Sequence, residues 1–149
     1  MPLKGIPSVI SPDLLYVLAS MGHGDELILA DAHFPTSSIC RFGPKEVRAD
    51  GLTIPKLLEA VLTLMPLDTY VTHPVCLMDK VPEDKAKGLQ TPIWTEYQVV
   101  IDNKENTQIN IEKIDRFKFY ERAKRAFAIV HTGELAQYGN IILKKGVAL

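Results

Sequence analysis

Short apolar runs alternate with amphipathic segments along this chain, and that alternation restricts its possible folds more than any other feature. The run Leu27–Ala30 is nearly continuous in apolar residues, so it predicts a strand that is covered on both faces. Segments 11–22 and 53–66 have helical spacing, with Ser11 and Thr53 as expected N-caps. Strands that alternate with helices are typical of α/β proteins with a largely parallel sheet.

The alternation continues to the end of the chain. Further strands are expected within 46–52, 69–78, 108–114, 127–134 and 140–146, with a break in the second of these at Pro74. Further helices are expected over 92–103 and 115–126. Segments 31–44 and 79–92 contain proline, glycine and polar residues, which predicts two loops.

Composition and charge are those expected of an ordinary soluble globular domain. The 149 residues fit one domain, 1–149. A net charge of −1, from 17 basic and 18 acidic residues, gives no reason to expect nucleic acid or an anionic membrane as a partner. Cys40 and Cys76 form no CxxC or zinc pattern, which indicates buried or half-buried thiols in a reducing compartment. The chain has neither a signal-like N-terminus nor an apolar run of about 18 residues, so we expect a cytoplasmic protein.

Titratable residues flank the first strand in the stretch MGHGDELILADAHFP, residues 21–35. His23 lies between two glycines and could act as an acid or base near neutral pH, or simply cap the preceding helix. Asp31 directly follows the strand, where ligands bind in α/β sheets, although turn aspartates are also common there. His33 has no such position, and we expect an ordinary surface histidine.

The distance between the two candidates is a difficulty for a simple site. If the chain between His23 and Asp31 is extended, it spans roughly 20 Å or more at ~3.3 Å per residue. A small ligand cannot contact both residues across that length. Either the loop around His23 folds back over the sheet, or the two residues belong to copies of a site that is shared between subunits.

Other polar candidates lie near the end of the chain. Arg116 and Tyr120 are four residues apart, so on a helix they share one face. They could bind sugar hydroxyls or transfer a proton, or could simply be a solvated arginine and a half-buried tyrosine that anchors the helix. Tyr138 and Asn140 precede the last strand and could bind neighbouring hydroxyls, or could belong to an ordinary turn. Asp68 by itself predicts only a turn residue.

The usual cofactor and nucleophile motifs are missing from the sequence. It contains no GxGxxG, no GxxxxGK[ST], no HExxH and no nucleophile elbow. The remaining acid, base and hydrogen-bonding side chains fit a site for a sugar or small polyol better than a redox or phosphoryl-transfer site.

Three segments together resemble the RbsD/FucU family of sugar mutarotases: 21–35, RADGL at 48–52, and DRFKFYERAKRAFAIVHTGELAQYGNIILKKG at 115–146. The forms GHGDE and FYERA are similar to the fucose mutarotase branch, and the ribose pyranase branch differs in the second. Residues from about 80 to 110 show little similarity. The resemblance implies a single three-layer α/β/α domain with the RbsD-like fold.

The resemblance also implies an activity. Such proteins interconvert the α and β anomers of L-fucose, and some interconvert the pyranose and furanose forms of D-ribose. They need no cofactor or metal. They are cytoplasmic and form symmetric homo-oligomers, decameric rings in bacterial members, with a site near a subunit interface.

The family's motifs also imply roles for individual residues of this sequence. The resemblance implies that His23 is the proton donor and that Tyr120 and Asp68 are catalytic, the last on the weakest match. It implies substrate contacts at Asp31, Arg116, Tyr138, Gly139 and Asn140. The division of acid and base roles between His23 and Tyr120 stays open, since a tyrosine base would need Arg116 beside its oxygen.

Two alternatives remain at this point. One is ribose pyranase as the main or a second activity, against which the FYERA form argues. The other is a sugar-binding protein on the same fold without catalysis, which fold alone does not distinguish from an enzyme.

Overall fold

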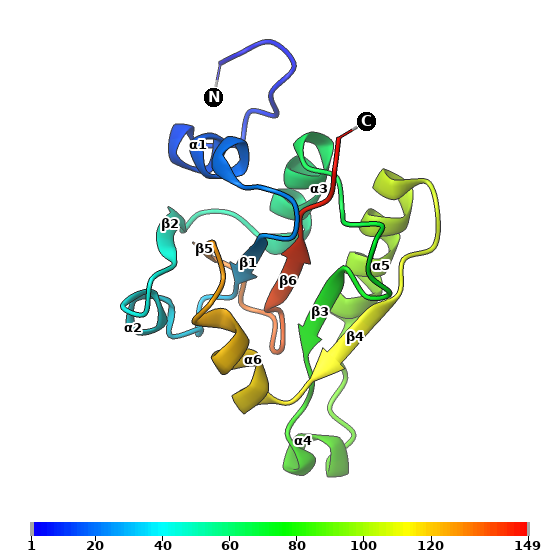
Figure 1. The fold of residues 1–149 in the computed structure, drawn as a ribbon. Helices are drawn as coiled ribbons and strands as arrows, with labels where there is room; N and C mark the ends of the chain where they lie inside the picture. The colour runs from blue at the N-terminus through cyan, green and yellow to red at the C-terminus, as the bar shows by residue number, and fades with distance from the viewer. Residues whose placement is uncertain (1, 149) are drawn as a thin grey trace.

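A mixed six-stranded sheet forms the centre of the computed structural model, which describes residues 2–148 (Figure 1). The strands are β1 (Glu26–Ala30), β2 (Lys45–Ala49), β3 (Val75–Met78), β4 (Ile111–Ile114), β5 (Ala128–Thr132) and β6 (Ile141–Lys144). Their order across the sheet is β2-β5-β1-β6-β3-β4.

The sheet is largely parallel, as predicted, with β6 as the exception. β6 pairs antiparallel with both β1 and β3, whereas the β2–β5, β5–β1 and β3–β4 pairs are parallel. A parallel connection needs about a dozen or more residues for its crossover. The segment 133–140 between β5 and β6 is shorter than that, so β6 returns in the opposite direction.

Helices cover both faces of the sheet and confirm the predicted three-layer α/β/α architecture. One face carries α1 (Pro12–Ser20), α3 (Ile54–Leu64) and α5 (Pro92–Glu105), and the other carries α2 (Thr36–Cys40) and α6 (Arg116–Ala123). A short helix, α4 (Pro82–Ala86), lies beyond the end of the sheet and has no buried residue (Figure 1).

The side chains of β1 show why its sequence is almost continuously apolar. Leu27 and Leu29 pack in the core under α1, α3 and α5, while Ile28 and Ala30 pack in the core under α2 and α6. All four are fully buried, which confirms a strand covered on both faces.

Helix starts follow the expected capping residues, with one difference. The Ser11 hydroxyl accepts a hydrogen bond from the Leu14 amide at 3.1 Å, as an N-cap should. Thr53 holds the N-cap position of α3, but its side chain makes no capping bond. Instead the Ile54 amide donates to Glu134 Oε1 at 3.0 Å, so a carboxylate from the β5–β6 connection caps this helix.

Two loop predictions were wrong, and one predicted strand is shortened at the break expected at Pro74. The predicted loops 31–44 and 79–92 contain α2 and α4, which at five residues each are too short to show helical periodicity. The strand expected within 69–78 covers only Val75–Met78. It begins directly after Pro74, which has no N–H to donate to a strand ladder.

The structure also bears on the predicted thiols and on membrane-spanning helices. Cys40 is half-buried and Cys76 is buried, and both are free thiols, as expected. None of the helices within residues 2–148 is long and apolar enough to cross a membrane.

Candidate active site

A cavity of about 350 Å³ opens at the carboxyl end of β1. This position agrees with the general rule for ligand sites in α/β sheets. The cavity is lined by Asp31, His33, Phe34, Met78, Val81, Asp84, Arg116, Tyr120, Gln137, Tyr138 and Asn140. Five of the predicted site residues are therefore brought together here, although they come from three separate segments of the chain.

Asp31 is the buried carboxylate of this cavity. Its side chain is only 4% exposed. Burial raises the pKa of Asp31 above its ordinary value of 3.8, and the backbone amides of His33 and Gly139 only partly oppose that rise. The Asp31 amide donates to Asn140 Oδ1 at 2.7 Å, which fixes Asp31 and Asn140 relative to each other.

Tyr138, Gly139 and Asn140 end the β5–β6 connection, which lines one side of the cavity. Tyr138 has a positive φ of 59°, which is uncommon for a non-glycine residue. Two side chains of α5 hold this turn by its carbonyls. Trp94 Nε1 donates to the Tyr138 carbonyl at 2.8 Å, and the buried Tyr97 hydroxyl donates to the Gly139 carbonyl at 2.7 Å.

The Tyr138 hydroxyl reaches the segment around α4. It donates to Asp84 Oδ2 at 2.5 Å and accepts from the Val81 amide at 3.2 Å. Burial and the bond to Asp84 raise the pKa of Tyr138. This phenol therefore stays protonated at neutral pH and is suited to orienting a ligand rather than to removing a proton.

Arg116 and Tyr120 lie on one face of α6, as their spacing predicts. Arg116 Nε donates to Tyr120 Oη at 3.0 Å. The Tyr120 ring packs edge-on against Phe34, with ring centroids 5.7 Å apart. A guanidinium beside the phenolic oxygen stabilises negative charge on that oxygen, as a tyrosine base requires.

A second polar cluster lies at the opposite end of the sheet. His23 Nε2 is 2.9 Å from Asp68 Oδ1, and the Tyr70 amide donates to the same oxygen at 3.0 Å. The Tyr70 ring lies 5.2 Å from the imidazole, between centroids. The Asp68 amide donates to the Lys144 carbonyl, which is at the carboxyl end of β6 and hence beside the amino end of β1.

Burial and charge in this pair suit proton transfer. Asp68 is 4% exposed, whereas His23 is 45% exposed. Burial works to raise the pKa of Asp68, but hydrogen bonds from the Tyr70 amide and His23 outweigh it and hold that pKa below its usual value. An ionised Asp68 that binds Nε2 leaves His23 Nδ1 as the nitrogen that can face a ligand.

The loop around His23 does not fold back over the sheet. The Gly24 amide donates to the Lys145 carbonyl at 2.9 Å, which holds the loop at the amino end of β1. His23 and Asp31 are therefore separated by the length of β1. Of the two alternatives drawn from the sequence, the folded-back loop is contradicted by this geometry, and a site shared between subunits stays a prediction.

Several residues around the cavity were missed in the sequence. His33 was expected to be an ordinary surface residue; it is exposed but lines the cavity. Asp84 and Val81 lie in a segment that was expected to be only a loop. Trp94 and Tyr97 support the site from a helix whose pattern indicates only packing, so no signal in the sequence identifies them. Among residues 2–148, no three His, Cys, Asp or Glu side chains cluster closely enough to hold a metal ion.

Comparison with known proteins gives a consistent result. Residues 4–148 match the RbsD / FucU transport protein family. The chain is 65% identical to the fucose mutarotase of Mus musculus, over 97% of this chain and 94% of the mouse protein. It is 50% identical to the L-fucose mutarotase of Actinobacillus pleuropneumoniae, over 97% of this chain and 96% of the bacterial protein.

Solved structures show the same fold. The fucose mutarotase of Streptococcus pneumoniae, in complex with L-fucose, has a TM-score of 0.87 and 46% identity, and the match covers 99% of this chain and all of that one. Bacillus subtilis RbsD, complexed with D-ribose, has a TM-score of 0.69 and 25% identity over the full length of both chains.

Proposed function

The chain belongs to the RbsD/FucU family, and from that premise we propose that it is a fucose mutarotase, an isomerase that interconverts the α and β anomers of L-fucose. Relatives of that name are 50–65% identical to it over nearly their whole length. The similarity of its fold to a structure with bound L-fucose supports the same substrate.

The observation that carries this proposal is the composition of the cavity at the carboxyl end of β1. A buried carboxylate, a guanidinium, two phenols and an amide converge on a space suited to one monosaccharide. We propose that Asp31, Arg116, Tyr138 and Asn140 bind the sugar hydroxyls, with Gly139 holding the turn that presents the last two. Asp31 and Asn140 are already joined by a hydrogen bond, so their spacing is set before the sugar enters.

We further propose that the proton donor comes from a second subunit. His23 is exposed and paired with Asp68, but it lies at the wrong end of β1 for the cavity of its own chain. A symmetric homo-oligomer would place the His23–Asp68 pair of one subunit over the cavity of its neighbour. Exposed apolar side chains lie beside both parts of the proposed shared site. Tyr70 and Val71 follow Asp68 in the pair with His23, and Phe117 follows Arg116 at the cavity.

The chemistry needs one acid and one base. When the ring opens, the C1–O5 bond breaks, the anomeric hydroxyl loses its proton and the ring oxygen gains one. We propose that His23, as the imidazolium, protonates the ring oxygen and becomes neutral, and that Tyr120, as a phenolate hydrogen-bonded to Arg116, accepts the anomeric proton and becomes a phenol. Rotation about C1–C2 then presents the other face of the aldehyde, and the two transfers reverse. Positioned proton transfer of this kind is typically worth about 10²–10⁴-fold in rate.

D-ribose is the second candidate substrate, because RbsD with bound D-ribose shares this fold at 25% identity. We place pyranose–furanose exchange of ribose behind fucose as a side activity. We also propose a cytoplasmic location, which rests on the resemblance alone, and fractionation of cells that express the tagged chain tests it.

NMR exchange spectroscopy of the anomeric protons tests the proposed function. The protein should speed exchange between α- and β-L-fucose well above the buffer rate, with a smaller effect on D-ribose. His23→Gln should remove the enhancement, whereas His73→Gln, which changes another exposed histidine, should keep it. Binding of L-fucose without faster exchange would contradict the proposal and favour a sugar-binding protein. Faster exchange for ribose than for fucose would favour a pyranase.

A further inference from the structure

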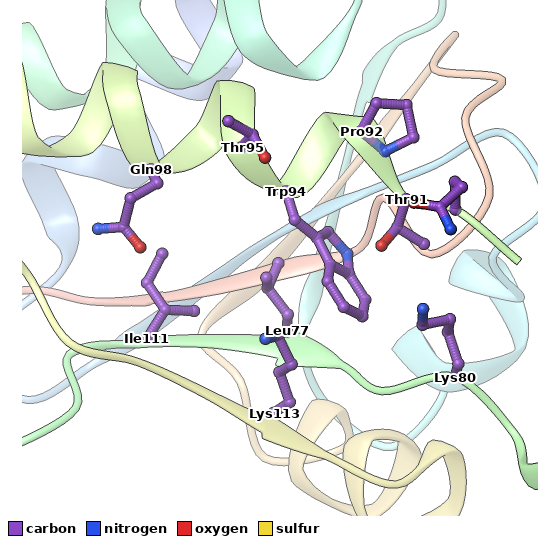
Figure 2. Close-up of a pocket in the computed structure, with 10 residues that line it drawn as sticks. Leu77, Lys80, Thr91, Pro92, Trp94, Thr95, Gln98, Ile111 and Lys113 are labelled. Atoms are coloured by element: carbon purple, nitrogen blue, oxygen red, sulfur yellow. The ribbon is translucent and has the colours of Figure 1, made fainter. Parts of the chain in front are cut away.

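A second cavity, of about 510 Å³, lies between α5 and the edge of the sheet formed by β3 and β4 (Figure 2). Its lining residues are Leu77, Lys80, Gln90, Thr91, Pro92, Trp94, Thr95, Gln98, Ile111 and Lys113. None of them lines the cavity that holds Asp31. In Figure 2 the indole of Trp94 projects from α5 toward the strands, with Lys80 and Lys113 on either side of it in the view.

Two ammonium groups dominate the charge of this cavity. Lys80 Nζ lies 5.5 Å and Lys113 Nζ 4.8 Å from the centre of the Trp94 ring. Lys80 is held in place by donating to the Leu89 carbonyl at 2.8 Å. Within residues 2–148, neither lysine forms an ion pair with a carboxylate. The neighbouring Asp79 is paired with Lys85 at 2.8 Å. The two cations flank one indole, and none of the lining residues is Asp or Glu, so the lining favours an anionic ligand.

The rest of the lining suits a hydroxylated group. Gln98 uses its Nε2 in bonds to Asp102 and the Ile109 carbonyl, and Gln90 uses its Nε2 in a bond to the Gly88 carbonyl. Within residues 2–148 these bonds leave both Oε1 atoms as acceptors for hydroxyl protons. Thr95 adds a further hydroxyl at the wall. An inorganic anion alone would fill only a small part of the space.

We propose that this cavity binds a phosphate monoester of a sugar or small polyol, with the phosphate attracted by the ammonium groups of Lys80 and Lys113, which flank Trp94, and the hydroxylated part along Gln98 and Thr95. The site is distinct from the proposed fucose site but adjoins it. Trp94 forms its wall and donates a hydrogen bond to the carbonyl of Tyr138. This ligand class lies outside the proposed mutarotase activity.

Tryptophan fluorescence tests the proposal directly, because Trp94 is the single tryptophan of the chain. The full chain is titrated with glucose 1-phosphate, with inorganic phosphate and with potassium chloride at matched ionic strength. Glucose 1-phosphate should change the emission with saturation, and inorganic phosphate should do so only at higher concentration. Chloride should give no saturable change.

Variants locate the binding. Lys80→Met and Lys113→Met should each weaken binding of glucose 1-phosphate at least about tenfold, whereas the surface variant Lys118→Met should not. Binding should survive Arg116→Ala, which removes the cation of the other cavity. Circular dichroism shows whether each variant is folded. No saturable change with glucose 1-phosphate, unchanged affinity in both lysine variants, loss of binding in Arg116→Ala, or equal affinity for inorganic phosphate would each overturn the proposal.

Discussion

His23 and Asp31 lie at opposite ends of β1, and each is fixed there by contacts from another part of the chain. His23 is paired with Asp68 at 2.9 Å, and the Asp31 amide is bonded to Asn140 at 2.7 Å. Neither can approach the other without breaking up the strand between them. If both act on one sugar, the catalytic unit is therefore an interface rather than a subunit.

Asp68 is expected to act through His23. Asp68→Asn keeps the size of the side chain but removes the charge that orients and stabilises the imidazolium. We expect kcat for anomer exchange to fall about tenfold or more, with the affinity for L-fucose unchanged, and His23→Gln to cost about 10²–10⁴-fold. Exchange NMR over a range of fucose concentrations separates the two parameters. Asp13→Asn, an exposed aspartate on α1, is the control; a raised KM with normal kcat in Asp68→Asn would contradict this role.

The two buried aspartates should respond to pH in opposite ways. The pKa of Asp68 is lowered in the folded protein, so it contributes stability above its ordinary value of 3.8 that is lost as the pH falls below it. The pKa of Asp31 is raised, so its contribution is present below 3.8 and is lost as the pH rises from there.

Thermal melts of the two Asn variants between pH 3 and 7 measure this difference. Relative to the parent chain, Asp31→Asn should gain stability as the pH rises through the range just above about 4. Asp68→Asn should lose relative stability over the acid range as the pH rises. Parallel pH profiles for the two variants would show that their environments do not differ as described.

Tyr97 is expected to hold the turn that carries the sugar contacts. Tyr97→Phe leaves the Gly139 carbonyl without its 2.7 Å hydrogen bond in a buried place, which typically costs about 1–3 kcal/mol. We expect a lower free energy of unfolding in urea and weaker L-fucose binding by calorimetry. Tyr16→Phe, which changes an exposed tyrosine, should alter neither. Normal fucose affinity in Tyr97→Phe would show that the turn does not need this bond.

Gly146 allows the close approach that positions Asp68. A Cβ at this residue would lie 2.4 Å from the Leu67 carbonyl oxygen and 2.8 Å from Asp68 Cα. Gly146→Ala should therefore destabilise the protein by about 1–3 kcal/mol and lower kcat by moving Asp68. Gly51→Ala, where a Cβ would meet nothing within 4 Å, is the matched control. Equal urea midpoints for the two variants would contradict this account.

The sequence predicts most helices and strands of this fold, because the spacing of apolar residues along a segment reflects which of its faces are buried. The nearly continuous apolar run Leu27–Ala30 predicted a strand covered on both faces, and the spacing of Arg116 and Tyr120 placed them on one helix face. The direction of β6 depends on the length of the connection before it, and α2 and α4 are too short to show a pattern. The support given by Trp94 and Tyr97 depends on contacts between distant segments, which a single sequence does not reveal.

Mixing two inactive variants tests the shared site most directly. His23→Gln and Asp31→Asn are purified separately, allowed to exchange subunits, and assayed by anomer exchange NMR, with mass spectrometry to confirm mixed oligomers. If each site takes His23 from one subunit and Asp31 from another, random mixing should restore about a quarter of the parent activity, since half of the subunits supply each intact part. Mixed oligomers without activity, or full activity of the parent chain as a monomer, would contradict a site that two subunits share.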